Sequence, residues 1–374
     1  MPEGLKILFA GMVAGDPHQG GATWAVIQYV LGLRELGHEI LLVEPISRQR
    51  LEGDSRILPY FHGLAWLEGG AALWDETEGS VDGLASERVL DFAAEADLLV
   101  NVSGMLRDER LLGSIPVRAF LDLDPGFNQV WQETGSEMGF DLHTHFLTVG
   151  QRLGEADCAV PDCGRDWLPT LPPVALRHWP RAAAPPREDA YTSVGHWRSY
   201  GSVEHEGIHY GQRAHSLRRL IDLPRRSDAR YLLALGIHPD EKDDLEALEA
   251  NGWDLVDPYR VAGDTSSYAE FVRGSKGELC VAKSGYVDSR SGWFSDRSAC
   301  YLASGRPVVA QETGFSSRLP TGEGLHAFVT AADAAAAVET IEADPAKHAK
   351  AARELAEEYL DSAKVLPRML DLLS

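Results

Sequence analysis

The sequence predicts an α/β protein with two Rossmann-like domains that face each other across a cleft. Two observations support this fold class. Short apolar runs alternate with helical stretches along the chain, and one long irregular segment divides the alternation into two halves. At 374 residues the chain is also longer than one hydrophobic core usually accommodates, so two domains are expected.

The first half opens with a β-loop-α-β unit, which is typical of a parallel sheet. Residues 6–10 (KILFA) form an apolar run, residues 22–36 carry apolar side chains at intervals of three or four, and residues 40–43 form a second apolar run. Gly37 is expected to end the intervening helix. Further strands are predicted at 97–102, 117–124 and 145–149.

Residues 158–190 are rich in proline and tryptophan and lack a strong periodicity, which indicates a connection between domains. We therefore expect a first domain over residues 1–178 and a second over 179–345. Apolar spacing over 345–360 predicts an amphipathic helix, and a short apolar segment follows at 365–373. Strands of the second domain are predicted at 191–195, 231–236, 253–257, 278–282, 307–310 and 326–329.

The chain carries 57 acidic and 35 basic residues, which gives a formal net charge of −22. A surface this acidic argues against nucleic acids and anionic membranes as partners, because both are negatively charged. We expect neither a signal peptide nor stable membrane insertion, since the N-terminus lacks a basic and a long apolar region and no run of about 18 apolar residues occurs. The prediction is a cytoplasmic protein with four reduced cysteines, and its oligomeric state stays open.

The segment over residues 283–315 predicts an anion site. A loop rich in glycine and serine leads into a helix start, a buried strand follows, and a polar turn stands at the carboxyl end of that strand. Unpaired N–H groups and the helix dipole both favour phosphate, so we expect a diphosphate here. The residues assigned to it are Ser295, Asp296, Arg297 and Ser298 at the helix start, and Glu312, Thr313 and Gly314 in the turn.

Three further polar side chains follow predicted strands of the second half. His196 and Arg198 come after the strand at 191–195, and Lys283 comes after the strand at 278–282. An arginine can bind phosphate through two N–H groups, and a lysine adds a point charge. We assign all three to the same anion; the alternative is that the cations are surface groups paired with some of the many acidic residues.

The loop after the first strand is rich in glycine. Gly20 and Gly21 precede the first helix, and paired glycines allow another group to approach the backbone, so we assign both to donor binding. Tight packing of helix and strand is the alternative. Neither the G-x-G-x-x-G fingerprint nor the G-x-x-x-x-G-K-[ST] loop is present, which argues against a dehydrogenase and a P-loop NTPase.

Two residues of the first half are candidates for catalysis. His18, in the same loop, can act as a general base toward an acceptor hydroxyl, although a hydrogen bond to backbone or water is an equally good interpretation. Asp122 and Asp124 alternate along one predicted strand and so share a face. They can hold a metal, face a substrate hydroxyl or cap the next helix. The metal interpretation is the weakest, because no third ligand stands at a recognisable spacing. We assign His18 and Asp122 to catalysis.

Two motifs together resemble the nucleotide-sugar glycosyltransferases of the GT-B fold, in particular bacterial members of families 1 and 4. The opening GGATWAVIQYVLGLRELGHEILLV is similar to the Gly-Gly loop, first helix and second strand of these enzymes, and LASGRPVVAQETGF is similar to their donor-binding helix and strand. The resemblance spans most of the chain. It implies sugar transfer from a nucleoside diphosphate sugar, UDP or TDP above all, to an acceptor hydroxyl without a metal or other cofactor. It also implies that helices within 346–374 cross back to the first domain.

One position departs from the family pattern. Many members carry a glutamate five residues before the glycine of A-x-G-x-P-V, where it holds the donor ribose, but this chain has Cys300 there and Gly292 at the partner position. Asp296 or Glu312 is expected to replace it. The acceptor, the donor sugar and the stereochemical outcome stay open. So do three alternatives: an epimerase or a phosphorylase of the same fold, and a non-catalytic nucleotide-sugar-binding protein.

Overall fold

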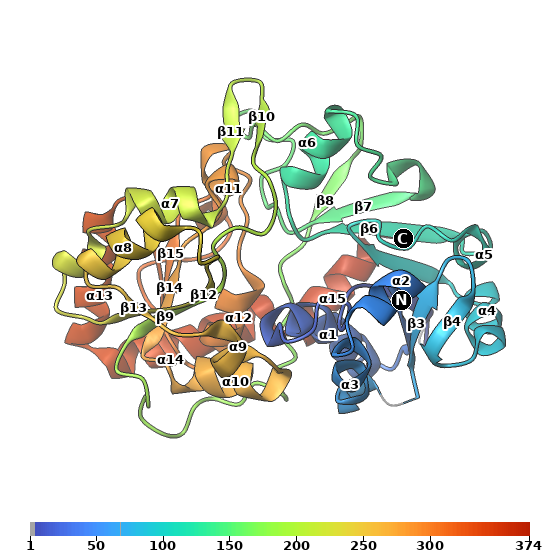
Figure 1. The fold of residues 1–374 in the computed structure, drawn as a ribbon, viewed down its shortest axis with the longest axis horizontal. Helices are drawn as coiled ribbons and strands as arrows, with labels where there is room; N and C mark the ends of the chain where they lie inside the picture. The colour runs from blue at the N-terminus through green and yellow to red at the C-terminus, as the bar shows by residue number, and fades with distance from the viewer. Residues whose placement is uncertain (1–3, 68) are drawn as a thin grey trace.

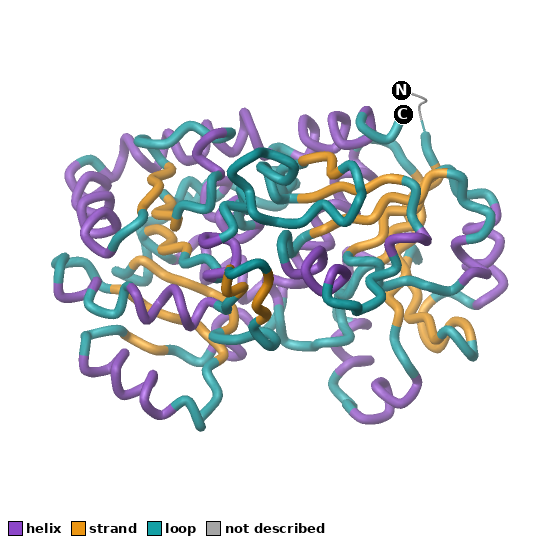
Figure 2. The backbone as a smooth tube through the Cα atoms, turned by 90° about the horizontal axis from the view of Figure 1, so that it is seen from above, coloured by secondary structure: helices purple, strands orange, loops and turns teal. Residues whose placement is uncertain are grey.

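The computed structural model describes residues 4–67 and 69–374 and contains two largely parallel sheets, each covered by helices (Figure 1). The two sheets confirm the predicted fold class of two Rossmann-like domains. Seen from above, their strands form two separate groups with helices around them (Figure 2).

The sheet of the first domain has the strand order β4-β3-β2-β1-β5-β6-β7-β8. All neighbouring strands run parallel except β3 and β4, which run antiparallel. The strands are β1 (Lys6–Ala10), β2 (Glu39–Pro45), β3 (Ala71–Asp75), β4 (Gly79–Gly83), β5 (Leu98–Val102), β6 (Val117–Asp122), β7 (His145–Thr148) and β8 (Trp167–Pro169). All five strands predicted for this half are confirmed, while β3, β4 and β8 were not predicted.

Helices connect many of the strands of this sheet in chain order and pack against the sheet. The predicted first helix begins two residues earlier than expected. The helices are α1 (Gly20–Glu35), α2 (Arg48–Gly53), α3 (Ile57–His62), α4 (Ser86–Ala94), α5 (Glu109–Leu112) and α6 (Phe127–Glu133), with short 3₁₀ helices at Ala65–Leu67 and Phe140–Leu142.

The sheet of the second domain has the order β13-β12-β9-β14-β15-β16, and all its neighbouring strands are parallel. Each of the six strands predicted for this half is confirmed. The strands are β9 (Tyr191–His196), β12 (Tyr231–Gly236), β13 (Asp254–Leu255), β14 (Gly277–Cys280), β15 (Val308–Gln311) and β16 (Leu325–Phe328). The helices are α7 (Arg213–Arg219), α8 (Lys242–Ala250), α9 (Pro258–Ala262), α10 (Thr265–Gly274), α11 (Ser284–Asp288), α12 (Asp296–Ala303) and α13 (Ala331–Ala343), with 3₁₀ helices at Leu223–Arg225 and Phe315–Ser317.

A β-hairpin that was not predicted interrupts the connection from β9 to α7. It consists of β10 (Val203–His205) and β11 (Ile208–Tyr210), which pair antiparallel. Both turn residues, Glu206 and Gly207, have positive φ, as a two-residue hairpin turn requires. The hairpin stands beside α6 of the first domain (Figure 1), and the Tyr210 hydroxyl donates to the carbonyl of Ala159 at 2.8 Å.

The C-terminal segment crosses back to the first domain, as predicted. The predicted helix over 345–360 divides into α14 (Pro345–Leu355) and a π-helical turn (Ala356–Leu360), and α15 (Ser362–Asp371) follows. Helix α15 packs closely on α1, because a Cβ atom at Gly32 would lie only 2.5 Å from Leu366. The backbone N–H of Val174 donates to the carbonyl of Leu360, and the carbonyl of Val174 accepts from the N–H of Ser362.

Two further features concern the chain as a whole. Within residues 4–67 and 69–374, none of the helices has the length and apolar character that crossing a bilayer requires. Cys280 and Cys300 are buried, and none of the four cysteines is joined in a disulfide.

Candidate functional site

A cavity of 430 Å³ lies between the two domains. It opens at the carboxyl ends of β1, β5 and β6 in one sheet and of β9 and β14 in the other, where open α/β sheets bind ligands, and helices α1, α7, α9 and α12 also contribute to its lining. The lining consists of Met12, His18, Gln19, Gly21, Ala22, Ala25, Val26, Val102, Ser103, Met105, Leu123 and Asp124 from the first domain, and of Val194, Gly195, His196, Ser199, Tyr200, Arg213, Pro258, Tyr259, Ala262, Lys283, Tyr286, Trp293, Asp296 and Arg297 from the second.

Arg213 begins α7 and holds its guanidinium at the cavity by two hydrogen bonds to backbone carbonyls. Its Nε donates to Val281 at 2.9 Å, and its Nη1 donates to His196 at 2.7 Å. The approach depends on Gly195, since a Cβ atom there would lie 2.4 Å from Nη1. Burial, aided by repulsion from Arg297, lowers the pKa of Arg213 to about 10, so it stays charged at neutral pH.

Arg297 lies at the start of α12. Its guanidinium lies 5.8 Å from the centre of the Trp293 ring, and its nearest carboxylate oxygen, on Asp296, is 3.9 Å away. Burial lowers the pKa of Arg297, but the nearby acidic groups, Asp296 above all, outweigh this effect and raise it. Both arginines therefore bring a permanent positive charge to the same wall of the cavity.

Lys283 joins the two domains across the cavity. Its Nζ lies 2.9 Å from Asp124 Oδ2 and is also within hydrogen-bond distance of the Tyr200 hydroxyl. The hydroxyl of Tyr286 donates to the same carboxylate. The ring of Tyr200 lies 4.1 Å from the Lys283 ammonium, a cation–π distance. Burial lowers the pKa of Lys283, although the charge of Asp124 opposes this shift.

The loop after β1 brings His18 to the first-domain side. His18 has φ of +67°, and Ser103, which also lines the cavity, has φ of +50°. Such conformations are uncommon outside glycine and cluster at functional sites. The loop is tied down by Glu44 of β2, whose carboxylate accepts from the backbone N–H groups of Val13, Ala14 and Gly15.

The structure brings six of the predicted site residues together. They come from three predicted groups: the loop after β1, the ends of β9 and β14, and the start of α12. A hydrogen bond of 2.8 Å between His196 Nε2 and Gln19 Oε1 links the first two groups across the domains. The six are His18, Gly21, His196, Lys283, Asp296 and Arg297.

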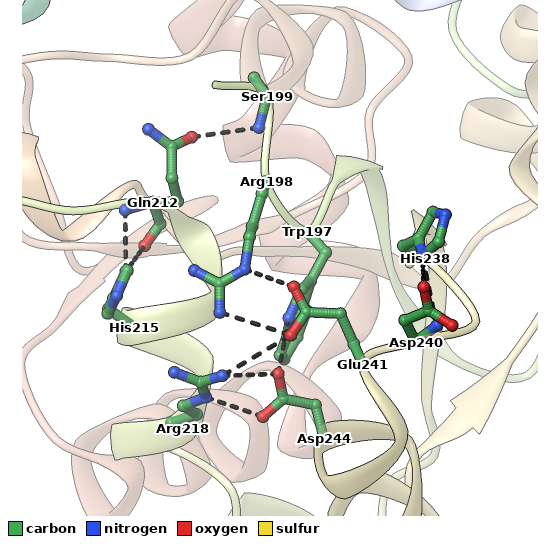
Figure 3. A network of polar contacts seen from close by, with 10 residues as sticks. All are labelled: Trp197, Arg198, Ser199, Gln212, His215, Arg218, His238, Asp240, Glu241 and Asp244. Carbon is green, nitrogen blue, oxygen red and sulfur yellow. Dashed lines mark hydrogen bonds and ion pairs between the residues drawn. The ribbon is translucent and has the colours of Figure 1, made fainter. Parts of the chain in front are cut away.

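Arg198 is not among the residues that line the cavity. It belongs to a polar network on the second domain, where its Nε donates to Glu241 at 2.5 Å and Arg218 pairs with Glu241 and Asp244 (Figure 3). Arg198 is therefore a cation paired with an acidic residue, which is the alternative given in the sequence analysis. The cation that reaches the cavity from this connection is Arg213, which was not predicted.

Asp122 is fully buried below the cavity instead of facing it. Its two oxygens accept hydrogen bonds from the backbone of Asp124 and from the side chains of Asn128, Gln129 and Thr148, at 2.6 to 2.9 Å. Burial raises its pKa to about 6, although these donors favour the ionised form. Asp122 thus organises the loop after β6. No group of three or more His, Cys, Asp or Glu side chains in the described ranges is arranged to hold a metal ion.

Gly20 lies where the two domains contact each other, and its lack of a side chain permits this contact. A Cβ atom there would lie 2.1 Å from the carbonyl oxygen of Asp264, at the start of α10. The indole of Trp24 donates to the carbonyl of Thr265 at 2.8 Å in the same region. The close approach that Gly20 permits is therefore that of the second domain's backbone.

The remaining predicted donor residues also lie outside the cavity lining. Ser295 and Ser298 are buried, and the Ser295 hydroxyl accepts from the backbone of Arg297. In the predicted turn, the Glu312 carboxylate accepts from the backbone N–H of Gly314, and the Thr313 hydroxyl donates to the carbonyl of Trp293. A Cβ atom at Gly314 would lie 2.4 Å from the side chain of Arg152 in the first domain.

Sequence reasoning missed Arg213, Tyr200, Tyr259 and Tyr286 as lining residues and did not assign Asp124 a role. In the sequence analysis, polar residues that come directly after a predicted strand were selected, and this criterion identified His196 and Lys283. Arg213 instead begins a helix after a hairpin. The one local sequence signal for Arg213 is that it is a cation at the start of a helix, preceded by a glycine and a glutamine.

No model of a known protein family matches the sequence, and neither does any curated protein. Several solved structures are similar over almost the whole chain. An alpha-glucosyltransferase (AGT) in complex with UDP has 12% identity and a TM-score of 0.61, with 98% of this chain and 99% of that chain covered. AviGT4, a glycosyltransferase involved in avilamycin A biosynthesis, has 15% identity and a TM-score of 0.55, with 98% and 96% covered.

HepE of Anabaena in complex with UDP and glucose has 14% identity and a TM-score of 0.60, with 99% of each chain covered. A further alpha-glucosyltransferase structure contains UDP-glucose and DNA with an abasic site. At these identities the likeness concerns the fold. The protein has the GT-B fold of these glycosyltransferases.

Proposed function

We propose that the protein is a glycosyltransferase that moves a sugar from a nucleoside diphosphate sugar to an acceptor hydroxyl. The observation that carries this proposal is the set of cations on the second-domain wall, Arg213, Lys283 and Arg297. Lys283 has a bonded carboxylate, but no carboxylate of the described residues is hydrogen-bonded to the two guanidinium groups. Guanidinium groups held largely out of water in this way suit a diphosphate, which accepts several charge-assisted hydrogen bonds.

In this proposal the donor lies along the second domain. Its diphosphate binds between Arg213 and Arg297, and its nucleoside lies toward Tyr259, a side chain of α9 that is 56% exposed. Asp296 is the carboxylate that takes the ribose, because it lines the cavity and Glu312 does not. UDP is the preferred nucleotide, since it is bound in the similar AGT and HepE structures.

The reaction follows from these positions. As the bond between sugar and diphosphate breaks, negative charge grows on the diphosphate, and the two arginines stabilise it. They supply the positive charge that a metal would otherwise provide, so the proposed reaction is metal-independent. His18, on the opposite wall, accepts the proton of the acceptor hydroxyl.

Thermal shift against UDP, TDP, GDP, ADP and NAD tests the donor site, because a ligand that binds the folded protein raises its melting temperature. We expect the largest shift from UDP. A shift from NAD with none from the nucleoside diphosphates would overturn the proposal.

Product analysis with UDP-sugars then tests the chemistry. A glycosyltransferase releases UDP slowly by hydrolysis and faster with an acceptor. An epimerase converts the sugar without net release of UDP, a phosphorylase needs phosphate to form a sugar phosphate, and a non-catalytic binder does none of these.

A further inference from the structure

The two walls of the cavity differ in chemistry. The second-domain wall carries the cations, whereas the first-domain wall is built mainly from apolar side chains. Its members, called the apolar wall below, are Met12 after β1, Ala22 and Ala25 on α1, Met105 after β5 and Leu123 after β6. Each keeps part of its surface uncovered by other protein atoms.

The polar side chains beside the apolar wall are mostly engaged within the protein. Gln19 bonds to His196 at 2.8 Å, Asp124 pairs with Lys283, and the Ser103 hydroxyl accepts from Asn128 at 3.5 Å. Among the described residues of this wall, His18 is the polar side chain that forms no hydrogen bond. The wall therefore offers an incoming molecule His18, the remaining O–H donor of Ser103 and a broad apolar surface.

This composition selects among acceptors. A carbohydrate brings many hydroxyl groups, and each that loses water without gaining a partner weakens binding. A hydrocarbon body gains from every apolar contact, and the two methionines can adapt to its shape. The available space also limits size, because 430 Å³ must hold part of the donor as well.

We infer that the acceptor is an uncharged, largely hydrocarbon small molecule with a hydroxyl group, bound against the apolar wall with that hydroxyl at His18. The inference rests on the proposed function and excludes glycans and nucleic acids as acceptors. In the reaction the acceptor oxygen bonds to the anomeric carbon, and the bond from that carbon to the diphosphate oxygen breaks. The electron pair leaves with the nucleoside diphosphate, and the hydroxyl proton moves to His18.

A binding experiment with naphthol, a compact aromatic alcohol, tests this inference without requiring turnover. Naphthol fluorescence is titrated with protein in the presence and in the absence of UDP, for the native chain and for Met105→Gln and Met12→Gln. We expect each variant to bind naphthol about fivefold more weakly while its affinity for UDP stays within about twofold. Leu255→Gln is the matched control, since Leu255 is an apolar side chain of the second domain that is 43% exposed outside the cavity.

Transfer assays with UDP-hexoses then compare naphthol, maltose and a DNA duplex as acceptors. Glycosylated naphthol with unmodified maltose and DNA supports the inference. Failure of naphthol to bind, binding that Met105→Gln leaves unchanged, or transfer to maltose or DNA overturns it. Naphthol binding that depends on Met105 in a protein that binds no nucleoside diphosphate supports the apolar site and refutes the proposed glycosyltransferase.

Discussion

Lys283 and Asp124 form an ion pair of 2.9 Å that joins the loop after β14 in one domain to the loop after β6 in the other. Both side chains are largely withheld from water, at 13% and 23% exposure. The pair places a carboxylate next to the cations that would hold a diphosphate. A bound diphosphate and Asp124 therefore compete for the same positive charge.

We predict that Asp124→Asn strengthens UDP binding about tenfold, because it removes a negative charge from the cavity and keeps a polar group for Tyr200 and Tyr286. Isothermal titration calorimetry measures the change. Asp288→Asn, which breaks the pair of Asp288 with Arg219 at 2.8 Å, controls for the loss of an ion pair elsewhere. Weaker binding by Asp124→Asn would show that this carboxylate helps to hold the donor.

Arg213→Lys should weaken UDP binding by roughly 10- to 100-fold, because a lysine keeps the charge but cannot donate to two carbonyls and to a phosphate in one plane. Arg198→Lys provides a matched control, since Arg198 pairs with Glu241 away from the cavity, and we expect its affinity to stay within about twofold. Titration of both variants with UDP decides the assignment. Equal losses in the two would remove Arg213 from the proposed site.

Gly20→Ala should disturb the contact between the domains, because the new Cβ would lie 2.1 Å from the backbone oxygen of Asp264. Relief of this clash requires a shift of the backbone, since no flexible side chain is involved. We expect a loss of about 1–3 kcal/mol in the free energy of unfolding and weaker UDP binding. Gly53→Ala serves as the control, because nothing lies within 4 Å of a Cβ there. Thermal melting of both variants is the measurement, and equal melting temperatures would contradict the close contact.

The fold was predictable because its evidence is local. The run over residues 6–10 coincides with β1, and the apolar spacing after Gly21 continues through α1. Strand β3 escaped prediction because its sequence, AALWD, contains two alanines, an aspartate and no β-branched residue, whereas the equally buried β5 is rich in leucine and valine. Strand β8 has only three residues, too few to form a pattern.

The site was predictable where it depends on strand ends, on the glycine-rich loop after β1 and on the start of α12. His196 is the last residue of β9 and Lys283 comes shortly after β14, and parallel strands bring their carboxyl ends to one edge of a sheet. Arg198 stands equally close to a strand in sequence, but its partner Glu241 lies 43 residues away, a pairing that no local pattern reveals. The hairpin between β9 and α7 is what returns Arg213, instead of Arg198, to the cavity.

Asp122→Asn should lower stability and leave the chemistry of folded protein nearly unchanged. The carboxylate accepts four hydrogen bonds, and an amide nitrogen in its place leaves donors unpaired in a fully buried site, at a cost of about 2–4 kcal/mol. Urea unfolding measures the loss, with Asp141→Asn as an exposed control that pairs with Arg165. A large fall in kcat at unchanged stability would instead give Asp122 a catalytic role.

Glu44 should make stability depend on pH. Burial raises the pKa of its carboxyl from 4.5 to about 7, although the backbone donors of Ala14, Gly15 and Val13 favour the ionised form. The folded protein then holds a proton that the unfolded chain has released between these values. The stabilising contribution is therefore present below about pH 4.5 and is lost as the pH rises through about 7, by about 3 kcal/mol.

Glu44→Gln removes this titration and keeps an acceptor oxygen of the same size for the loop that carries His18. We expect the free energy of unfolding of the native chain to fall, relative to this variant, between pH 5 and pH 8. Urea unfolding at several pH values measures the difference. Glu78→Gln is the control, because Glu78 is 45% exposed in its pair with Arg48. Parallel pH profiles for the native chain and Glu44→Gln would show that Glu44 is ionised throughout, in which case the three backbone donors outweigh its burial.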